Sequence, residues 1–125
     1  MITGTVNANS EATIRLTVQG LRGQEQEIEA VIDTGFTGSL TLPPSLITVL
    51  GLTWLTQGRV MLGDGRVEVF DIYAAIVTWD EKPLRVMVDA ADTDPLVGMA
   101  LMYGYELNVQ NVEGGAVTLK PLPNL

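Results

Sequence analysis

The chain has 125 residues, the length of one ordinary domain, and 46% of them are hydrophobic. It contains no cysteine and no histidine, which excludes disulfides, thiolate metal sites, Ser-His-Asp triads and Cys-His catalysis. The net charge is -8, and the seven basic residues are scattered, so the basic patch that nucleic-acid binding needs is missing. Any catalysis must therefore use carboxylates, hydroxyls, lysine or backbone groups.

Nothing in the sequence predicts contact with a membrane. The start of the chain lacks the basic and apolar regions of a secretory signal, and the longest nearly uncharged stretch, Ile72–Trp79, is too short to span a bilayer. We therefore expect a cytoplasmic location. Residues 1–125 show no linker, low-complexity tract or internal repeat, so we expect a single domain.

Short strand patterns and one helix pattern make up the first half of the chain. The expected elements are strands over Thr13–Val18, Glu27–Ile32 and Ser39–Leu42 and a helix over Pro44–Leu50. The helix is predicted because proline suits the first helical turn and Gly51 can end the last one. Glu25, Glu27 and Glu29 alternate along the second strand and predict its solvent-exposed face.

Hairpins dominate the second half. The expected strands are Gln57–Leu62, Arg66–Phe70 or beyond, Val69–Trp79, Pro83–Val88, Glu106–Val109 and Ala116–Lys120. Turns are expected at Gly63-Asp64-Gly65, at Asp80–Lys82 and at Gly114-Gly115, because Asp-Gly and Gly-Gly between alternating residues favour hairpins. Pro95–Gly104 predicts a strand end followed by one or two helical turns. This succession of short strands indicates an all-β barrel or sandwich.

The segment Asp33-Thr34-Gly35 is the candidate for chemistry. An aspartate at the end of a buried apolar strand is costly unless its carboxylate is hydrogen-bonded or used. A plain turn is the alternative, because Asp, Thr and Gly all favour turns. The apolar pair Val31 and Ile32 before the segment, and the short strand with Pro43 after it, favour a functional interpretation.

The segment Ala30–Pro43, AVIDTGFTGSLTLP, resembles the retropepsin-like (clan AA) aspartic proteases, in particular a prokaryotic group whose motif is DTGF. The Gly63-Asp64-Gly65 hairpin and the Leu96-Val97-Gly98 segment match the family in order and spacing over nearly the whole chain. The resemblance implies an all-β fold, a retropepsin-like closed β-barrel (the acid-protease fold) with one or two short helices.

The resemblance also implies an aspartic endopeptidase that cleaves extended polypeptides without metal or cofactor. In this family two carboxylates share one proton and activate a water. The chain has one DTG, so the second Asp33 would come from a second copy in a homodimer. Asp33 would be the catalytic carboxylate, Thr34 would hydrogen-bond across the dimer axis, and Gly35 would let the backbone pass close to the carboxylates.

Further residues receive a substrate-binding role from the resemblance. They are Phe36, Thr37, Leu62, Gly63, Asp64, Gly65 and Gly98. The Leu62–Arg66 hairpin would be a flap that closes over the peptide, although an ordinary exposed turn has the same pattern. Gly98 would lie behind the active-site loop; a glycine at a helix start has the same pattern, and the two interpretations are compatible. Phe36 stands where retroviral members carry Ala or Ser, so Thr37 offers the nearest substitute hydroxyl.

Weaker candidates have simpler interpretations. Asp89, Asp92 and Asp94 could suggest calcium, but they miss the EF-hand spacing, and we expect a solvated loop. The aromatic residues expected in the core or in an interface are Trp54, Trp79, Tyr103 and Tyr105.

Two other functions remain open at this stage. One is a catalytically silent module with the same fold that dimerises or binds peptides, because a fold does not determine a function. The other is a structural β-domain in which Asp33 caps a turn. For a dimer, we expect the terminal strands Met1–Val6 and Ala116–Pro121 to contribute to the interface.

Overall fold

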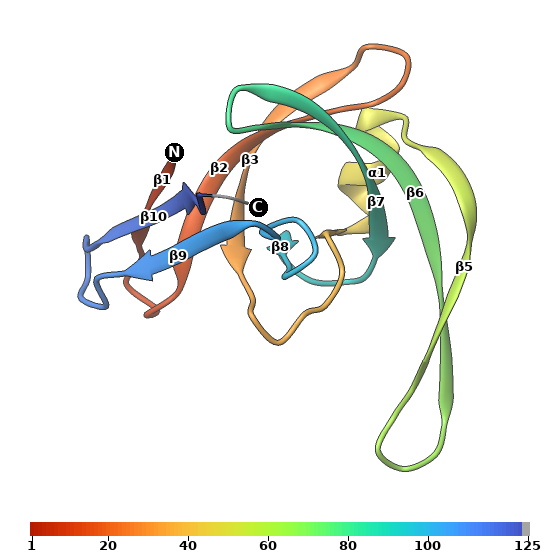
Figure 1. Cartoon of the computed structure of the whole chain (residues 1–125). Coiled ribbons are helices and arrows are strands. Elements are labelled where there is room, and N and C mark those ends of the chain that lie inside the picture. Colours follow the sequence, from red (N-terminus) through yellow and green to blue (C-terminus); the bar gives the residue numbers. More distant parts are fainter. Residues whose placement is uncertain (124–125) are drawn as a thin grey trace.

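The computed structural model describes residues 1–123, which form ten strands and one helix (Figure 1). In chain order these are β1 (Ile2–Val6), β2 (Ala12–Gln19), β3 (Glu25–Ile32), β4 (Leu40–Leu42), α1 (Pro44–Leu50), β5 (Thr53–Met61), β6 (Val67–Trp79), β7 (Lys82–Ala90), β8 (Leu96–Val97), β9 (Tyr105–Val109) and β10 (Ala116–Pro121). Within these residues, no helix is both long and apolar enough to cross a membrane.

Six of the strands close into a barrel. Their order is β6-β7-β4-β8-β3-β2, and β2 returns to β6 through the pairs Val18↔Val77 and Gln19↔Ile76. Closure removes the free edges that an open sheet would expose at this point. The expected closed all-β barrel with a short helix is confirmed.

The barrel interior is filled by branched aliphatic side chains. On β2 the burial alternates, with Ile14, Leu16 and Val18 buried and Arg15 exposed, as a half-buried strand requires. Helix α1 adds Ile47 and Leu50 to the same core. The three alternating glutamates of β3 are exposed, as the sequence predicted.

The helix has the boundaries that the sequence predicted. Pro44 occupies its first turn, and Gly51 ends it in the left-handed region with φ of 60°. The backbone N–H of Gly51 donates to the Thr48 carbonyl over 3.0 Å. The expected short strand begins one residue later than predicted, at Leu40.

The segment after β8 differs from the prediction. Residues 99–104 form consecutive turns instead of a helix, and one helix-like hydrogen bond joins the Met102 N–H to the Gly98 carbonyl over 3.3 Å. Gly104, with φ of 85°, then reverses the chain into β9. The backbone N–H groups of Met99 and Ala100 donate to the Phe36 and Gly38 carbonyls, so the start of this segment follows the loop after β3.

The terminal strands form a small sheet beside the barrel (Figure 1). β1 pairs with β2 on one side and β10 on the other, and β10 pairs in turn with β9. Both hydrogen-bonding edges of β1 and β10 are therefore used within the chain. A partner strand could add at β9, the outer strand of this sheet.

We predict that Leu40→Ala lowers the free energy of unfolding by about 2–5 kcal/mol, because it empties a fully buried site. Val49→Ala is the matched control, since Val49 is 67% exposed on α1 and its loss should change stability by less than about 0.5 kcal/mol. Urea titration of both variants measures the difference. Equal effects would contradict the assignment of Leu40 to the core.

Candidate active site

The loop between β3 and β4 carries the candidate catalytic residue. β8 lies between these two strands, parallel to β3 and antiparallel to β4. The backbone N–H of Asp33 donates to the Val97 carbonyl over 2.9 Å, and the Gly98 N–H donates to the Ser39 carbonyl over 3.0 Å. Both ends of the loop are therefore held by the same short strand.

Asp33 is half-buried at the start of this loop. Its Oδ1 accepts a hydrogen bond from the Gly35 N–H over 2.9 Å, and its carbonyl accepts one from the Phe36 N–H over 3.1 Å. Thr34 and Gly35 are exposed. The segment is thus a tight turn that presents a carboxylate at the surface. Among the described residues Thr37 makes no hydrogen bond to Asp33, so the expected substitute hydroxyl is not engaged here.

Phe36 packs against two glycines that lie far apart in the sequence. A Cβ at Gly38 would lie 2.5 Å from the Phe36 ring, and a Cβ at Gly98 would lie equally close to that ring and overlap the Gly38 carbonyl oxygen. The carbonyl of Phe36 accepts the Met99 N–H over 2.8 Å. Gly98 therefore permits a close backbone approach, and the chain after it continues in the turns of residues 99–104, the first of which its carbonyl helps to close.

A groove of about 670 Å³ lies beside the loop. Its walls come from the loop, from the stem of the β5–β6 hairpin and from the end of β7. The lining residues are Gly35, Phe36, Thr37, Thr41, Arg59, Val60, Glu68, Val69, Phe70, Asp89, Ala90, Ala91 and Asp92. Two predicted binding residues, Phe36 and Thr37, thus share a groove with the hairpin.

The hairpin tip lies outside this groove. Figure 1 shows the hairpin extending beyond the barrel on the same side as the loop after β3. Its stem lines the groove, whereas the predicted flap residues Leu62, Gly63, Asp64 and Gly65 do not. Gly98 is buried behind the loop and does not line the groove either.

The tip is a well-formed turn. The Gly65 N–H donates to the Leu62 carbonyl over 2.9 Å, and Gly65 has φ of 86°, which favours glycine. Asp64 accepts from the backbone N–H of Arg66 over 3.0 Å and pairs with its guanidinium. The backbone N–H first, and the guanidinium second, lower the pKa of Asp64.

Asp89 is a groove residue whose environment differs from the one that the sequence predicts. It was expected in a solvated loop, but it lies within β7, where it pairs with Thr41 of β4 on one side and Ile72 of β6 on the other. The carboxylate is partly buried, and this desolvation raises its pKa. Asp92 and Asp94 follow in the loop. Within residues 1–123, no three acidic side chains are grouped to hold a metal ion.

The aromatic residues divide into two sets. Trp79 is in the core and packs edge-on against Tyr105, with ring centroids 5.8 Å apart. Trp54 and Tyr103 are 54% and 79% exposed, so of the two expected places, the core or an interface, these two residues are not in the core of the chain. Trp54 lies near the start of β5, where its Nε1 donates to Asp71 of β6 over 3.1 Å.

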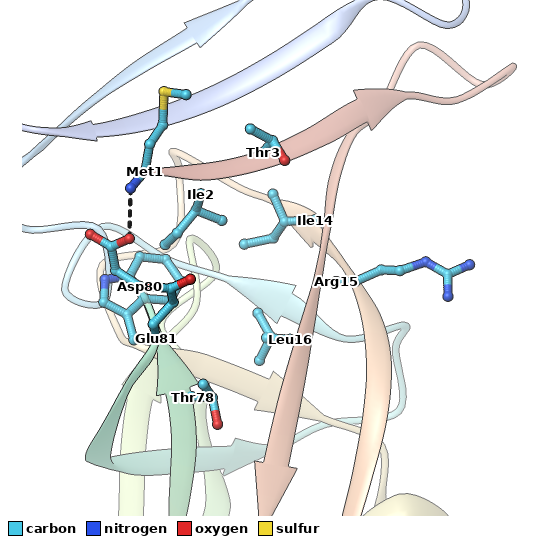
Figure 2. Close-up of a pocket in the computed structure, with 10 residues that line it drawn as sticks. Met1, Ile2, Thr3, Ile14, Arg15, Leu16, Thr78, Asp80 and Glu81 are labelled. Atoms are coloured by element: carbon cyan, nitrogen blue, oxygen red, sulfur yellow. Dashed lines mark hydrogen bonds and ion pairs between the residues drawn. The ribbon is translucent and has the colours of Figure 1, made fainter.

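A smaller pocket of about 210 Å³ lies between β1, β2 and the β6–β7 turn (Figure 2). The N-terminal ammonium donates to Asp80 Oδ1 over 2.7 Å. Figure 2 shows this contact, with the Arg15 side chain pointing away from the pocket. The ammonium, and then the Tyr105 hydroxyl, lower the pKa of Asp80. None of the predicted site residues lines this pocket, so the groove beside the Asp33 loop is the better candidate.

Comparison with known proteins supports the fold. The crystal structure of a retropepsin-like aspartic protease from Rickettsia conorii is similar to this chain, with a TM-score of 0.60 and 16% sequence identity. The similarity covers 94% of this chain and 87% of that chain. No model of a known protein family and no curated protein sequence matches. The chain therefore has the fold of the retropepsin-like aspartic proteases.

We predict that Gly98→Ala destabilises the protein by about 1–3 kcal/mol, because the new methyl group meets backbone and an aromatic ring. Gly63→Ala is the matched control, since a Cβ there has no neighbour within 4 Å. Chemical denaturation measures both variants. If Gly98→Ala were as stable as Gly63→Ala, the close approach at Gly98 would be wrong.

We also predict that Asp89→Asn raises the Tm at neutral pH. The raised pKa means that the charged carboxylate is less favourable in the folded than in the unfolded state. Protonation favours folding, so this penalty is absent well below the unfolded pKa of about 3.9 and develops as the pH rises through the folded pKa. Thermal scans from pH 3 to 7 should show the gain only at the upper end. A constant gain at every pH would contradict this cause.

Proposed function

We propose that the protein is an aspartic endopeptidase whose active site forms from two copies of Asp33, one from each protomer of a homodimer. The observation that carries this proposal is the position of Asp33. A half-buried carboxylate stands on a tight loop beside a large groove, in a barrel with the fold of the retropepsin-like aspartic proteases.

The chemistry follows from what two such carboxylates can do together. Held close, they do not both ionise easily, so they share one proton and titrate as a unit. The ionised member takes a proton from a water as it attacks the scissile carbonyl, while the protonated member polarises that carbonyl. The Gly35 N–H, which binds Asp33 Oδ1, holds the carboxylate in place during these transfers.

The surface around the Asp33 loop supports a twofold contact between two protomers. Thr34 and Gly35 are exposed, and the adjoining turn exposes Met99 and Tyr103 by 49% and 79%. The Met99 N–H donates to the Phe36 carbonyl of the loop, so the exposed side chains of Met99 and Tyr103 lie on a turn that is fixed to the loop. We place the dimer axis here, with Thr34 hydrogen-bonding across it. The terminal strands are less suited, because β1 and β10 pair within the chain.

The substrate we propose is an extended polypeptide. It would lie in the groove between the loop and the hairpin stem, where Phe36, Val60 and Phe70 offer apolar contacts. The hairpin tip would close over it as a flap, since Leu62–Gly65 lies beyond the groove in this structure. A cytoplasmic location without a cofactor is part of the same proposal.

We predict that Asp33→Asn lowers cleavage of casein by about two to four orders of magnitude, the usual contribution of a general acid–base group. Assays should span pH 3 to 8, because the pH at which two coupled carboxylates share one proton is not fixed by either alone. Light scattering in each buffer should give the mass of a dimer for both proteins. Asp94→Asn, which removes an exposed carboxylate from another loop, should cleave as the unchanged protein does.

Equal cleavage by Asp33→Asn would contradict the mechanism. A stable dimer that binds peptides and cleaves none at any pH would instead support the silent binding module. A monomer throughout would favour a structural domain in which Asp33 only caps a turn.

A further inference from the structure

The groove is lined by carboxylates that the proposed mechanism does not use, whereas Asp33 itself does not line it. Asp89 lines the groove from the end of β7, and its Oδ2 is 3.5 Å from where a Cβ of Gly38 would stand. The carboxylate therefore lies against the same loop that carries Asp33 and Phe36. Its proximity to the loop makes it a candidate contact for a bound substrate.

Asp89 has no partner among the described residues. The ion pairs within residues 1–123 lie elsewhere, at Met1–Asp80, Arg15–Glu27 and Arg66–Asp64, and no side-chain hydrogen bond reaches Asp89. A partly buried carboxylate without donors is costly, and desolvation is the cause of its raised pKa. A ligand that supplies hydrogen-bond donors and positive charge would remove this cost.

Thr41 adds a second unused polar group at the same place. The residue is 5% exposed and lines the groove, and its hydroxyl makes no hydrogen bond within the described part of the chain. Thr41 and Asp89 are register partners on the neighbouring parallel strands β4 and β7, so their side chains lie on one face about 5 Å apart. Together they offer a hydroxyl and a carboxylate to one ligand group.

The charge of the groove favours a cation. Three carboxylates, of Glu68, Asp89 and Asp92, line it against one cation, Arg59. Arg59 makes no ion pair with Asp89 within 4 Å, so Asp89 is not neutralised by it. The excess negative charge of the groove would attract a basic side chain, and the oxygen atoms of Thr41 and Asp89 could accept its hydrogen bonds.

We propose that Asp89 and Thr41 form a subsite that selects a lysine or arginine side chain in the bound polypeptide. The charged end of that side chain would donate to the Asp89 carboxylate and the Thr41 hydroxyl, beside the Asp33 loop. This inference rests on the proposed function, since it assigns a specificity to the same groove. It adds a class of substrate, polypeptides with a basic residue near the scissile bond.

Binding measurements test the subsite without requiring cleavage. The protein is Asp33→Asn, and the probes are capped octapeptides of one uncharged sequence, in which each position in turn carries lysine or norleucine. Norleucine keeps the hydrocarbon chain and lacks the ammonium group. Titration calorimetry gives the ratio of the two dissociation constants at each position.

We expect one or two positions at which lysine binds about tenfold more tightly than norleucine, as a charged hydrogen bond of about 1.4 kcal/mol implies. Adding Asp89→Asn should reduce that ratio to about one, and adding Thr41→Val should reduce it about threefold. Adding Asp94→Asn, the matched charge control outside the groove, should leave the ratio unchanged.

The subsite is wrong if no position prefers lysine, including the case in which no peptide binds. It is also wrong if Asp94→Asn lowers the ratio as much as Asp89→Asn, because the preference would then reflect net charge alone. The casein assay separates the two proposals. Cleavage that depends on Asp33, without a lysine preference, overturns only the subsite; a lysine preference that depends on Asp89, without cleavage, overturns only the peptidase.

Discussion

The close approach of the Gly98 backbone to Gly38 is the constraint on which the rest of the site depends. It lets the two-residue strand β8 fit between β3 and β4, so that the barrel is continuous there. The same strand offers the Val97 carbonyl to the Asp33 N–H and so determines where the carboxylate stands. Barrel closure and the position of the candidate catalytic group therefore rest on one backbone contact, with the Phe36 ring packed over it.

Local patterns predicted most of the fold, because they are properties of a few neighbouring residues. The helix over Pro44–Leu50 follows from proline at its start and glycine at its end, and the hairpin at Gly63-Asp64-Gly65 follows from the Asp-Gly turn. The segment after β8 could not be predicted in this way. A two-residue strand has no periodicity, and the turns of residues 99–104 depend on hydrogen bonds to the Asp33 loop.

Residues of the candidate site could be predicted where they adjoin one another in the sequence. They could not be predicted where the fold brings distant segments together. Asp33, Thr34 and Gly35 adjoin one another in the sequence, so a local pattern is enough to propose them. Asp89 was assigned to a loop because Ala, Asp and Thr follow it, yet pairing with both β4 and β6 keeps it in β7. Whether the side chains of Asp89 and Thr41 find hydrogen-bond partners depends on how distant segments pack, so a local pattern does not reveal it. The contact of Phe36 with Gly98 likewise joins residues that local patterns treat separately.

Strand β6 has two uses along its length. Its second half is a wall of the barrel, where Val77 pairs with β2, and its first half is the hairpin stem beside the groove. A register shift in β5 between Trp54 and Thr56 separates these halves. Because the outer pairs end at a free tip, two-residue insertions or deletions there would change how far the hairpin reaches without altering any pair inside the barrel. The length of the β5–β6 hairpin and the stability of the barrel can therefore evolve independently.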